Sequence, residues 1–394
     1  MATIYEVSEL AGVSLATVSR VMNNNARVSD KTKEKVLAAM KQLDYRPNSI
    51  AQSLASNCSN SVGILVSELS GYFYGAMLSG IESELRAAHK HVIIAAGHAE
   101  EATEIESIEF LIGRNCDALI LHVEAVSDEY LIKLSQGTTP IVLINRYIEE
   151  LADRCISLNN EQGGYLATKA LLEQGHIDLA VISGPLWKED AKNRLNGHKR
   201  ALEEFNVSFN HSLLVEGDYK ESGGSNGMQQ LLDKKIAFTA VVCANDETAS
   251  GAMTIAREHK LHLPADISII GFDNTIFARH LYPKLSTVNY PVDQMGEMAA
   301  TWVLKNVYKN DKLMINNLFK PELIIISAGF DAHSEDDMSQ VSLTEADYRW
   351  VTDELKVIAN EYGKGRIVSI LEGGYAPSAL GRSVVAHING LIGN

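Results

Sequence analysis

The sequence predicts an α/β protein with an N-terminal helix-turn-helix headpiece, two lobes that each contain a doubly wound parallel sheet, and a small extra α/β segment at the C-terminal end. Three observations lead to this prediction. Residues 1–45 contain short helical patterns and no strand. Residues 61–318 alternate apolar strands with amphipathic helices, which is typical of parallel sheets covered on both faces. Residues 319–394 repeat a strand–helix–strand–helix pattern. A polar connector over residues 46–60 completes four regions.

The composition is that of a soluble globular protein. Of the 394 residues, 46% are apolar and 22% are charged. No apolar run reaches the roughly 18–20 residues that a membrane span needs, and the N-terminus lacks the features of a secretory signal. Four scattered cysteines, Cys58, Cys116, Cys155 and Cys243, form no CxxC motif. We therefore expect reduced thiols, a cytoplasmic location, no membrane contact, no metal and no cofactor.

Residues 3–22 have the pattern of two short helices joined by a tight turn. Thr3 and Glu6 form a capping box at the start of the first helix, and Ser14 can cap the second. Gly12 supplies the backbone freedom that the turn between them needs. A third helix is expected over residues 29–43. The predicted inward-facing residues are Val7, Leu10, Ala11, Val18, Val21, Met22, Val36, Met40 and Leu43.

The second helix carries candidate DNA-reading side chains on its outward face. In a helix-turn-helix motif this helix enters the major groove. Arg20 can reach a base edge or a phosphate, Thr17 a phosphate, and Leu15 and Ala16 the methyl groups of thymine. A generic small helical bundle is the alternative, but it does not explain why these four residues face outward together.

Charge is unevenly distributed along the chain. The formal net charge is −15, but residues 1–60 hold seven Lys or Arg against five Asp or Glu, a net +2, so the remaining residues carry −17. A mildly basic head on an acidic body suits a protein that presents only one end to phosphate groups. This distribution permits DNA binding without demonstrating it.

The headpiece and connector resemble one known family. "TIYEVSELAGVSLATVSRVMN" and "YRPNSIAQSLAS" are similar to the signature of the LacI/GalR family of transcriptional repressors, and "VLINR", "NDETASGAM" and "SIIGFDN" resemble its galactose-repressor branch. The resemblance covers about residues 1–320. It implies a sequence-specific DNA-binding repressor of sugar-metabolism genes with periplasmic-binding-protein-like lobes. It also implies a homodimer, or a higher oligomer, on a pseudo-palindromic operator.

The same resemblance assigns a role to the connector. In the family this segment forms a hinge helix on operator DNA, two hinge helices pair, and a leucine enters the minor groove; by position this is Leu54. An apolar wedge partly unstacks a base step and kinks the duplex. The alternative is that Leu54 packs under the first lobe. The DNA-binding candidates are Thr3, Ser14, Leu15, Ala16, Thr17, Arg20, Asn48 and Leu54.

Seven strands are expected in the two lobes, at residues 62–66, 92–96, 118–123, 141–144, 179–182, 240–243 and 268–271, with helices at 74–88 and 163–174 among those between them. Ligands of such sheets bind beyond the carboxyl ends of the strands. A sugar needs polar side chains for its hydroxyls and an aromatic face for its ring. The candidate effector residues are Tyr72, Phe73, Asn145, Arg146, Arg194, Asn245, Asp246 and Asp273.

Two readings of these residues stay open. In the family the matching positions line a cleft between the lobes, where a galactose-like sugar changes the angle between the lobes and thereby the operator affinity. Alternatively, Asn and Asp after a strand cap the next helix, and Asp246 in particular suits such a cap.

The C-terminal segment resembles a different superfamily. "ISAGFDAH", "SLTEADYRWVTDELKVIA" and "RIVSILEGGY" are similar to the C-terminal part of the histone deacetylase/acetylpolyamine amidohydrolase superfamily. The resemblance implies that Asp331 matches a zinc ligand and Tyr375 a catalytic tyrosine. A catalytic zinc needs three protein ligands, and this chain has no adjacent His-His pair and only one of those ligands. We therefore expect an orphan fragment with no catalytic or metal site, joined through one strand at residues 322–327 that serves both frameworks.

Three classes of protein compete for the whole chain. A DNA-binding regulator explains the headpiece, the connector and the lobes. A zinc-dependent deacetylase explains only the C-terminal segment and lacks most of its site. An exported sugar-binding protein explains the lobes but not the headpiece. The sequence therefore predicts a regulator that is not an enzyme.

Overall fold

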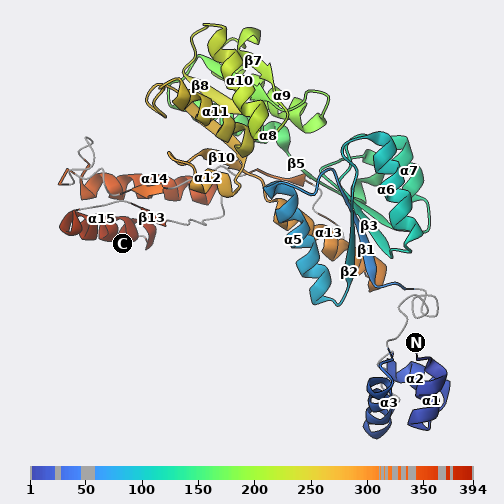
Figure 1. Cartoon of the computed structure of the whole chain (residues 1–394). Coiled ribbons are helices and arrows are strands. Elements are labelled where there is room, and N and C mark those ends of the chain that lie inside the picture. Colours follow the sequence, from blue (N-terminus) through green and yellow to red (C-terminus); the bar gives the residue numbers. More distant parts are fainter. Residues whose placement is uncertain are drawn as a thin grey trace. The chain divides into compact units, whose positions relative to one another are not determined.

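The computed structural model of the chain describes residues 2–22, 28–45, 58–309, 311, 315, 318–321, 327–329, 334–335, 343–362, 370–372 and 376–392 (Figure 1). The chain divides into two compact units. Unit 1 comprises Met1–Ile156 and Asp293–Asn317, and unit 2 comprises Ser157–Val292 and Leu318–Asn394. No described helix is long and apolar enough to cross a membrane.

The headpiece consists of α1 (Ile4–Ala11), α2 (Leu15–Met22) and α3 (Asp30–Gln42). The capping box is present, because the Glu6 carboxylate accepts from Thr3 N at 2.7 Å and Thr3 Oγ1 accepts from Glu6 N. Gly12 ends α1 in the left-handed region at φ 64°, as the tight turn requires. Leu10 was expected on the inner face, but its side chain is 45% exposed. The prediction for Leu10 is wrong, because Val7 and Ala11 already fill the inner face of this short helix.

The first sheet has six parallel strands in the order β11-β5-β4-β3-β1-β2. Leu65 and Leu121 on one face pack with α6 and α7. On α5 and α13, Gly80 and Gly296 each lie so close to the main chain of the other helix that a Cβ would clash. The elements of this region are β1 (Ser61–Val66), α5 (Tyr72–Ala87), β2 (His91–Ala96), α6 (Glu101–Gly113), β3 (Ala118–Leu121), α7 (Asp128–Ser135), β4 (Ile141–Ile144), the 3-10 helix Glu149–Arg154, β5 (Cys155–Leu158), α13 (Val292–Val303) with the π-helix Leu304–Tyr308, and β11 (Leu318–Phe319).

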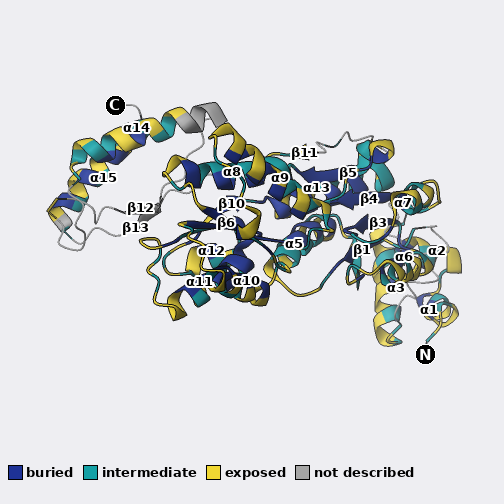
Figure 2. Ribbon diagram, turned by 90° about the horizontal axis from the view of Figure 1, so that it is seen from above, coloured by how far each residue is buried: buried dark blue, intermediate teal, exposed yellow. Residues whose placement is uncertain are grey.

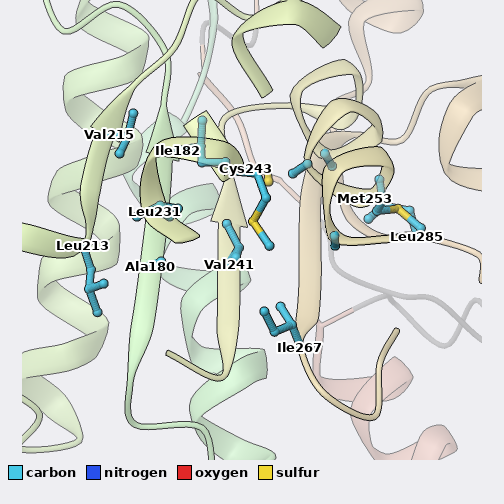
Figure 3. Packing of buried hydrophobic residues seen from close by; sticks show 14 of the residues in the cluster. Ala180, Ile182, Leu213, Val215, Leu231, Val241, Cys243, Met253, Ile267 and Leu285 are labelled. Atoms are coloured by element: carbon cyan, nitrogen blue, oxygen red, sulfur yellow. The ribbon is translucent and has the colours of Figure 1, made fainter. Parts of the chain in front are cut away.

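The second sheet has five parallel strands in the order β10-β9-β8-β6-β7. On one face, Ile182, Val241 and Cys243 pack against Leu231 of α10 and Met253 of α11 (Figure 3). The elements of this region are α8 (Asn160–Glu173), β6 (Leu179–Ser183), α9 (Glu189–Glu204), the 3-10 helix His211–Leu213, β7 (Leu214–Glu216), α10 (Glu221–Asp233), β8 (Ala240–Cys243), α11 (Asp246–Glu258), β9 (Ser268–Asp273), α12 (Ile276–His280) and β10 (Ser286–Asn289).

Each sheet has a point where the strand order reverses. In the first sheet this point lies between β1 and β3, and in the second between β6 and β8. Connections leave such neighbouring strands toward opposite sides, which opens a crevice at their carboxyl ends. The residues that follow these four strands are therefore the first place to look for a ligand site.

The described part of the C-terminal segment contains a third, two-stranded sheet and two helices. Strands β12 (Ser327–Gly329) and β13 (Ile370–Glu372) pair in parallel, and α14 (Glu345–Tyr362) packs with α15 (Pro377–Ile392). Both helices carry buried and exposed residues (Figure 2), and Trp350 is 64% exposed. Of the shared strand expected at residues 322–327, residues 322–326 lie outside the described residues. The described residues on either side belong to two different sheets, since β11 pairs with β5 and β12 with β13.

All seven predicted strands are present in the structure: β4 and β8 have the predicted bounds, and each of the other five has one shifted end. The pattern does not predict β5, β7, β10 and β11, which have two to four residues each. It also ends one strand too early. Phe272 and Asp273, expected just after a strand, are the last residues of β9.

Candidate functional site

The outward face of α2 is available for DNA contact. Leu15, Ala16 and Arg20 are exposed and Thr17 is half-buried, while Val18 and Val21 form the buried face. Ser14 caps the helix, because its Oγ accepts from Thr17 N at 3.2 Å and lies 2.9 Å from Thr17 Oγ1. The structure thus presents the predicted reading residues on one short, capped helix.

Two other DNA-binding candidates cannot be placed. Asn48 and Leu54 lie outside the described residues, as do Asp331 and Tyr375 of the C-terminal segment. Thr3 is exposed, and its hydroxyl donates to the Glu6 carboxylate at 2.9 Å. Within the described residues, no group of three or more His, Cys, Asp or Glu side chains is arranged to hold a metal ion.

Arg194 is the central side chain of a polar and aromatic cluster in unit 2. Its Nε donates to Asn160 Oδ1 at 2.9 Å, and one Nη donates to the carbonyl oxygen of Ala244 at 2.6 Å, directly after β8. The same nitrogen lies 3.8 Å from the Asp273 carboxylate. The Arg194 side chain is only 11% exposed, so its guanidinium is fixed at the edge where the order of the second sheet reverses.

Aromatic rings surround this guanidinium. Its Cζ lies 3.7 Å from the ring centroid of Phe272, 5.6 Å from that of Tyr219 and 5.8 Å from that of Tyr290. Stacking of this kind holds an arginine in one orientation, so the N–H groups that make no bond to the protein point in fixed directions. The sequence pattern missed Tyr219, Tyr290 and Asn160. Tyr219 has a positive φ of 67° after the three-residue strand β7, so periodicity gives no signal for it.

Asp273 has an unusual backbone. Its φ is 103°, which is rare for a residue with a side chain and is typical of functional sites. Burial raises the pKa of its carboxyl well above the usual value, and the Arg194 charge offsets part of this effect. For Arg194 itself, burial works to lower the pKa, but the neighbouring Tyr219 and Asp273 raise it. The arginine therefore stays charged, and the buried Asp273 Oδ1 accepts no hydrogen bond among the described residues.

Asn245 and Asp246 are engaged with the protein. Asn245 caps α11, since its Oδ1 accepts from Thr248 N at 2.9 Å, and its Nδ2 donates to Tyr219 O at 2.9 Å. Asp246 is fully buried and accepts from Thr275 N at 2.6 Å and Thr287 Oγ1 at 2.5 Å. Burial raises the pKa of Asp246 to about 6, although these hydrogen bonds work in the opposite direction. In this structure, Asn245 thus holds the loop that bears Tyr219, and Asp246 ties three elements together.

Unit 1 carries its own cluster at the carboxyl ends of β1 and β3. The rings of Phe73 and Tyr74 at the start of α5 lie edge-on to His122, with centroids 6.0 and 5.5 Å away. Ser67 Oγ lies 3.3 Å from His122 Nδ1. Tyr72 is 50% exposed beside them. His122 and Tyr74 are further residues that the sequence pattern did not identify.

Asn145 and Arg146 follow β4 in the same unit. Asn145 has a φ of 60°, and its N–H donates to Ile156 O at 2.7 Å. Arg146 forms an ion pair with Asp128 at 2.7 Å, at the start of α7. Arg146 is therefore oriented by a partner within its own unit.

A helix-turn-helix headpiece followed by two parallel α/β sheets, with polar and aromatic clusters at their carboxyl ends, defines a transcription regulator. Family models agree with this class: residues 3–48 match bacterial regulatory proteins of the lacI family, and residues 168–325 match a periplasmic binding protein-like domain. The HTH-type transcriptional regulator GalR of Escherichia coli strain K12 is 38% identical over 324 residues, 82% of this chain and 94% of the relative. The ribose operon repressor of Haemophilus influenzae is 34% identical over 307 residues, 78% of this chain and 92% of the relative. The chain belongs to the lacI family.

Solved structures give the same result for the fold. The lac repressor dimer bound to operator and the anti-inducer ONPF has a TM-score of 0.73 at 29% identity, over 82% of this chain and 98% of that one. The complex of the transcriptional regulator CelR with cellobiose has a TM-score of 0.61 at 26% identity, over 84% of this chain and 100% of that one.

The C-terminal segment matches a third family model, the histone deacetylase domain, over residues 279–391. This match covers less than a third of the chain. It begins about 40 residues before the boundary near residue 320 that the motifs suggest, within residues that form α12, β10 and α13 here. The resemblance of the segment to that superfamily is thereby confirmed as a similarity of sequence.

Proposed function

We propose that this chain represses sugar-metabolism genes by binding a pseudo-palindromic operator as a cytoplasmic homodimer, and that galactose or a close relative controls its operator affinity. It has no enzymatic activity of its own. Three regions serve this function: a headpiece at residues 1–45, a hinge at 46–60 and effector-binding lobes at 61–318. Residues 319–394 are an orphan amidohydrolase-like segment that takes no part in it. On the DNA side, α2 reads the major groove with Leu15, Ala16, Thr17 and Arg20, and Leu54 and Asn48 act in the hinge.

The observation that carries the effector proposal is Arg194. It is buried, charged and held by protein acceptors on one side, and aromatic rings flank it at the reversal point of the second sheet. A fixed guanidinium donates to paired hydroxyls, and aromatic rings take the apolar face of a pyranose. The names of similar proteins, a ribose operon repressor and a CelR–cellobiose complex, fit a sugar ligand.

The test replaces Arg194 with lysine, which keeps the charge but loses the planar fork. A hydrogen bond to a charged group contributes roughly 1.5–3 kcal/mol, so galactose affinity measured by calorimetry should fall about 10- to 100-fold. Arg200→Lys on the exposed side of the same helix is the matched control, because the side chain of Arg200 contacts Glu161, Gln162 and the ring of Tyr165 and none of the residues around Arg194.

Operator binding is measured in parallel by fluorescence anisotropy, with and without galactose. We expect R194K to bind operator as the wild type does and to need far more galactose for any response, while R200K behaves as the wild type. If R194K responds to galactose at the wild-type concentration, Arg194 is not an effector contact. If the wild type ignores galactose but responds to another monosaccharide, only the identity of the sugar is wrong.

A further inference from the structure

A second polar cluster lies at the amino-terminal edge of the first sheet. Asp117 immediately precedes β3, Lys90 precedes β2, and residues 58–60 precede β1. Amino ends of parallel strands share one edge of a sheet, so these residues lie at the edge opposite to Phe73 and His122. Tyr308 reaches the same edge from the last turn of the π-helix that follows α13.

The Asp117 carboxylate gathers this cluster. One oxygen accepts from Ser59 N at 2.7 Å and from Ser59 Oγ at 3.1 Å. The other accepts from Tyr308 OH at 2.7 Å and from Cys58 Sγ at 3.3 Å. Asp117 is half-buried, and burial alone works to raise its pKa, but the bonds from Ser59, Tyr308 and Cys58 hold the pKa below its usual value. The carboxylate is therefore ionised at neutral pH, which strengthens each of these hydrogen bonds.

Lys90 fixes the next residue of the chain. Its Nζ donates to Asn60 Oδ1 at 2.6 Å and lies 3.7 Å from the ring centroid of Tyr308. Asn60 itself has a left-handed φ of 55°. Its carbonyl accepts from His91 N at 2.8 Å. Three consecutive residues, 58 to 60, are thus held by Asp117 before β3 and by Lys90 and His91 at the start of β2, and Tyr308 supports Asp117.

These three residues are the point at which the connector joins the first lobe. The connector that resembles the family hinge ends within residues 46–60, and β1 begins at Ser61. Hydrogen bonds from the lobe to this junction fix the direction in which the connector leaves the lobe. Without them, the connector would be joined to the lobe only through the covalent chain. π-Helical turns such as Leu304–Tyr308 often occur at functional sites, and this one places the Tyr308 hydroxyl within hydrogen-bonding distance of the Asp117 carboxylate.

We propose that Asp117 is a positioning residue for operator binding: its carboxylate, with Tyr308 and Lys90, clamps residues 58–60 and fixes the C-terminal end of the DNA-binding connector to the first lobe. This inference rests on the proposed operator binding. An ordered junction lowers the conformational entropy lost when the connector settles on DNA, so the clamp raises operator affinity without touching DNA.

The experiment uses the full chain and a double-stranded operator selected from random DNA by the wild-type protein. Asp117→Asn replaces one acceptor oxygen by an NH2 group, and Tyr308→Phe removes one hydroxyl but keeps the ring beside Lys90. Asp153→Asn is the matched control, since Asp153 is an exposed partner of Arg154 in the same unit. Operator and non-specific DNA affinities are measured at one fixed salt concentration, and amide hydrogen exchange is followed at Ser59.

We expect Asp117→Asn to accelerate exchange at Ser59 at least ten-fold and to weaken operator binding about ten-fold, with non-specific DNA binding and galactose affinity unchanged. Tyr308→Phe should produce smaller changes in the same direction, and it serves as the test if Asp117→Asn does not fold. Faster exchange at Ser59 with wild-type operator affinity overturns the positioning role. Unchanged exchange at Ser59 overturns the clamp itself. Failure of the wild type to select any operator refutes the proposed function instead, and the exchange measurement still tests the clamp.

Discussion

Buried ionisable side chains in both units bind the protein's own backbone. Glu104 is 1% exposed, and its carboxylate accepts from three consecutive N–H groups, of Glu124, Ala125 and Val126, at 2.8–2.9 Å. This arrangement fixes the loop that follows His122. Asp246 has a comparable role between α11, α12 and β10. Single carboxylates therefore hold the loops on which the candidate ligand residues stand.

His198 provides a residue-scale prediction for unit 2. Thr168 Oγ1 donates to Gly164 O at 2.9 Å and so accepts from His198 Nδ1, 2.8 Å away, which places the ring proton of His198 on Nδ1. Burial, and to a lesser degree the Lys199 charge, lowers the pKa of His198 to about 4. The ring should therefore stay neutral at neutral pH, and an NMR titration of its Cε1 proton should give a midpoint near pH 4.

The sign of the effect on stability follows from this shift. The unfolded chain takes up a proton at His198 near pH 6.5, but the folded chain does so only near pH 4. The contribution is thus complete above pH 6.5 and is lost as the pH falls toward 4, by up to about 3 kcal/mol. In the His198→Phe variant the His198 resonance is missing from the NMR spectrum, which assigns the signal. Relative to this variant, the wild type should lose stability as the pH falls over this range. A constant difference between the two would contradict a neutral buried ring.

Which site residues the sequence predicts depends on how they are placed. Arg194 lies in the helix α9 and Asp273 at the end of the strand β9, and the family resemblance points to both positions. Tyr219 and Tyr290 come from irregular segments beside short strands, and their approach to Arg194 is a tertiary event that no local pattern encodes. His122 is missed because the expected strand continues through residue 123, whereas β3 ends at Leu121.

Helix pairs approach one another through reciprocal glycines. In α8 and α9, a Cβ on Gly164 would strike the carbonyl of Arg194, and a Cβ on Gly197 would strike the carbonyl of Glu161. Gly224 and Gly251 form the same relation between α10 and α11, each against the other helix. This close packing fixes the distance between α9 and α8, and with it the position of Arg194 on α9.

Gly197→Val tests this element-scale argument. Overpacking costs typically 1–3 kcal/mol, so the variant should unfold at a lower denaturant concentration. Because α9 must move away from α8, galactose affinity should fall as well, while operator affinity without sugar is retained. Gly113→Val, at the exposed end of α6 with nothing near its Cβ position, is the control and should lower stability only by a fraction of this amount. Equal stability of the two variants would mean that the helices are not in firm contact.

At the element scale, regular apolar strands are predictable and short ones are not. The runs at β3, β4 and β8 consist of four buried residues each, and their apolar letters suffice to find them. β5 and β10 are equally short but read Cys-Ile-Ser-Leu and Ser-Thr-Val-Asn, so their polar letters hide them. Their burial comes from pairing with neighbouring strands, which is a property of the whole sheet.

At the scale of the whole molecule, the question is where the regulator ends along the chain. β11 adds two residues to the edge of the first sheet beside β5, and the carbonyl of Phe319 accepts from Asn159 N at 2.9 Å. After Pro321, the described residues pair only among themselves in β12 and β13. The helices α14 and α15 are joined by Thr352 and His387, whose side chains lie 2.6 Å apart. By its pairing, β11 belongs to the first sheet, whereas β12 and β13 form a sheet of their own.

Two truncations that differ by four residues test this division. A chain that stops after Pro321 keeps β11 and should bind operator, respond to galactose and unfold at the wild-type temperature. A chain that stops after Asn317 exposes the edge of β5 and leaves the Asn159 N–H without the Phe319 carbonyl, so it should melt several degrees lower and aggregate more readily. Melting by circular dichroism and operator binding by anisotropy decide the outcome. If the longer truncation product also loses operator binding or sugar response, the segment after Pro321 is a working part of the regulator. Because both chains lack α14 and α15 equally, any difference between them belongs to residues 318–321 alone.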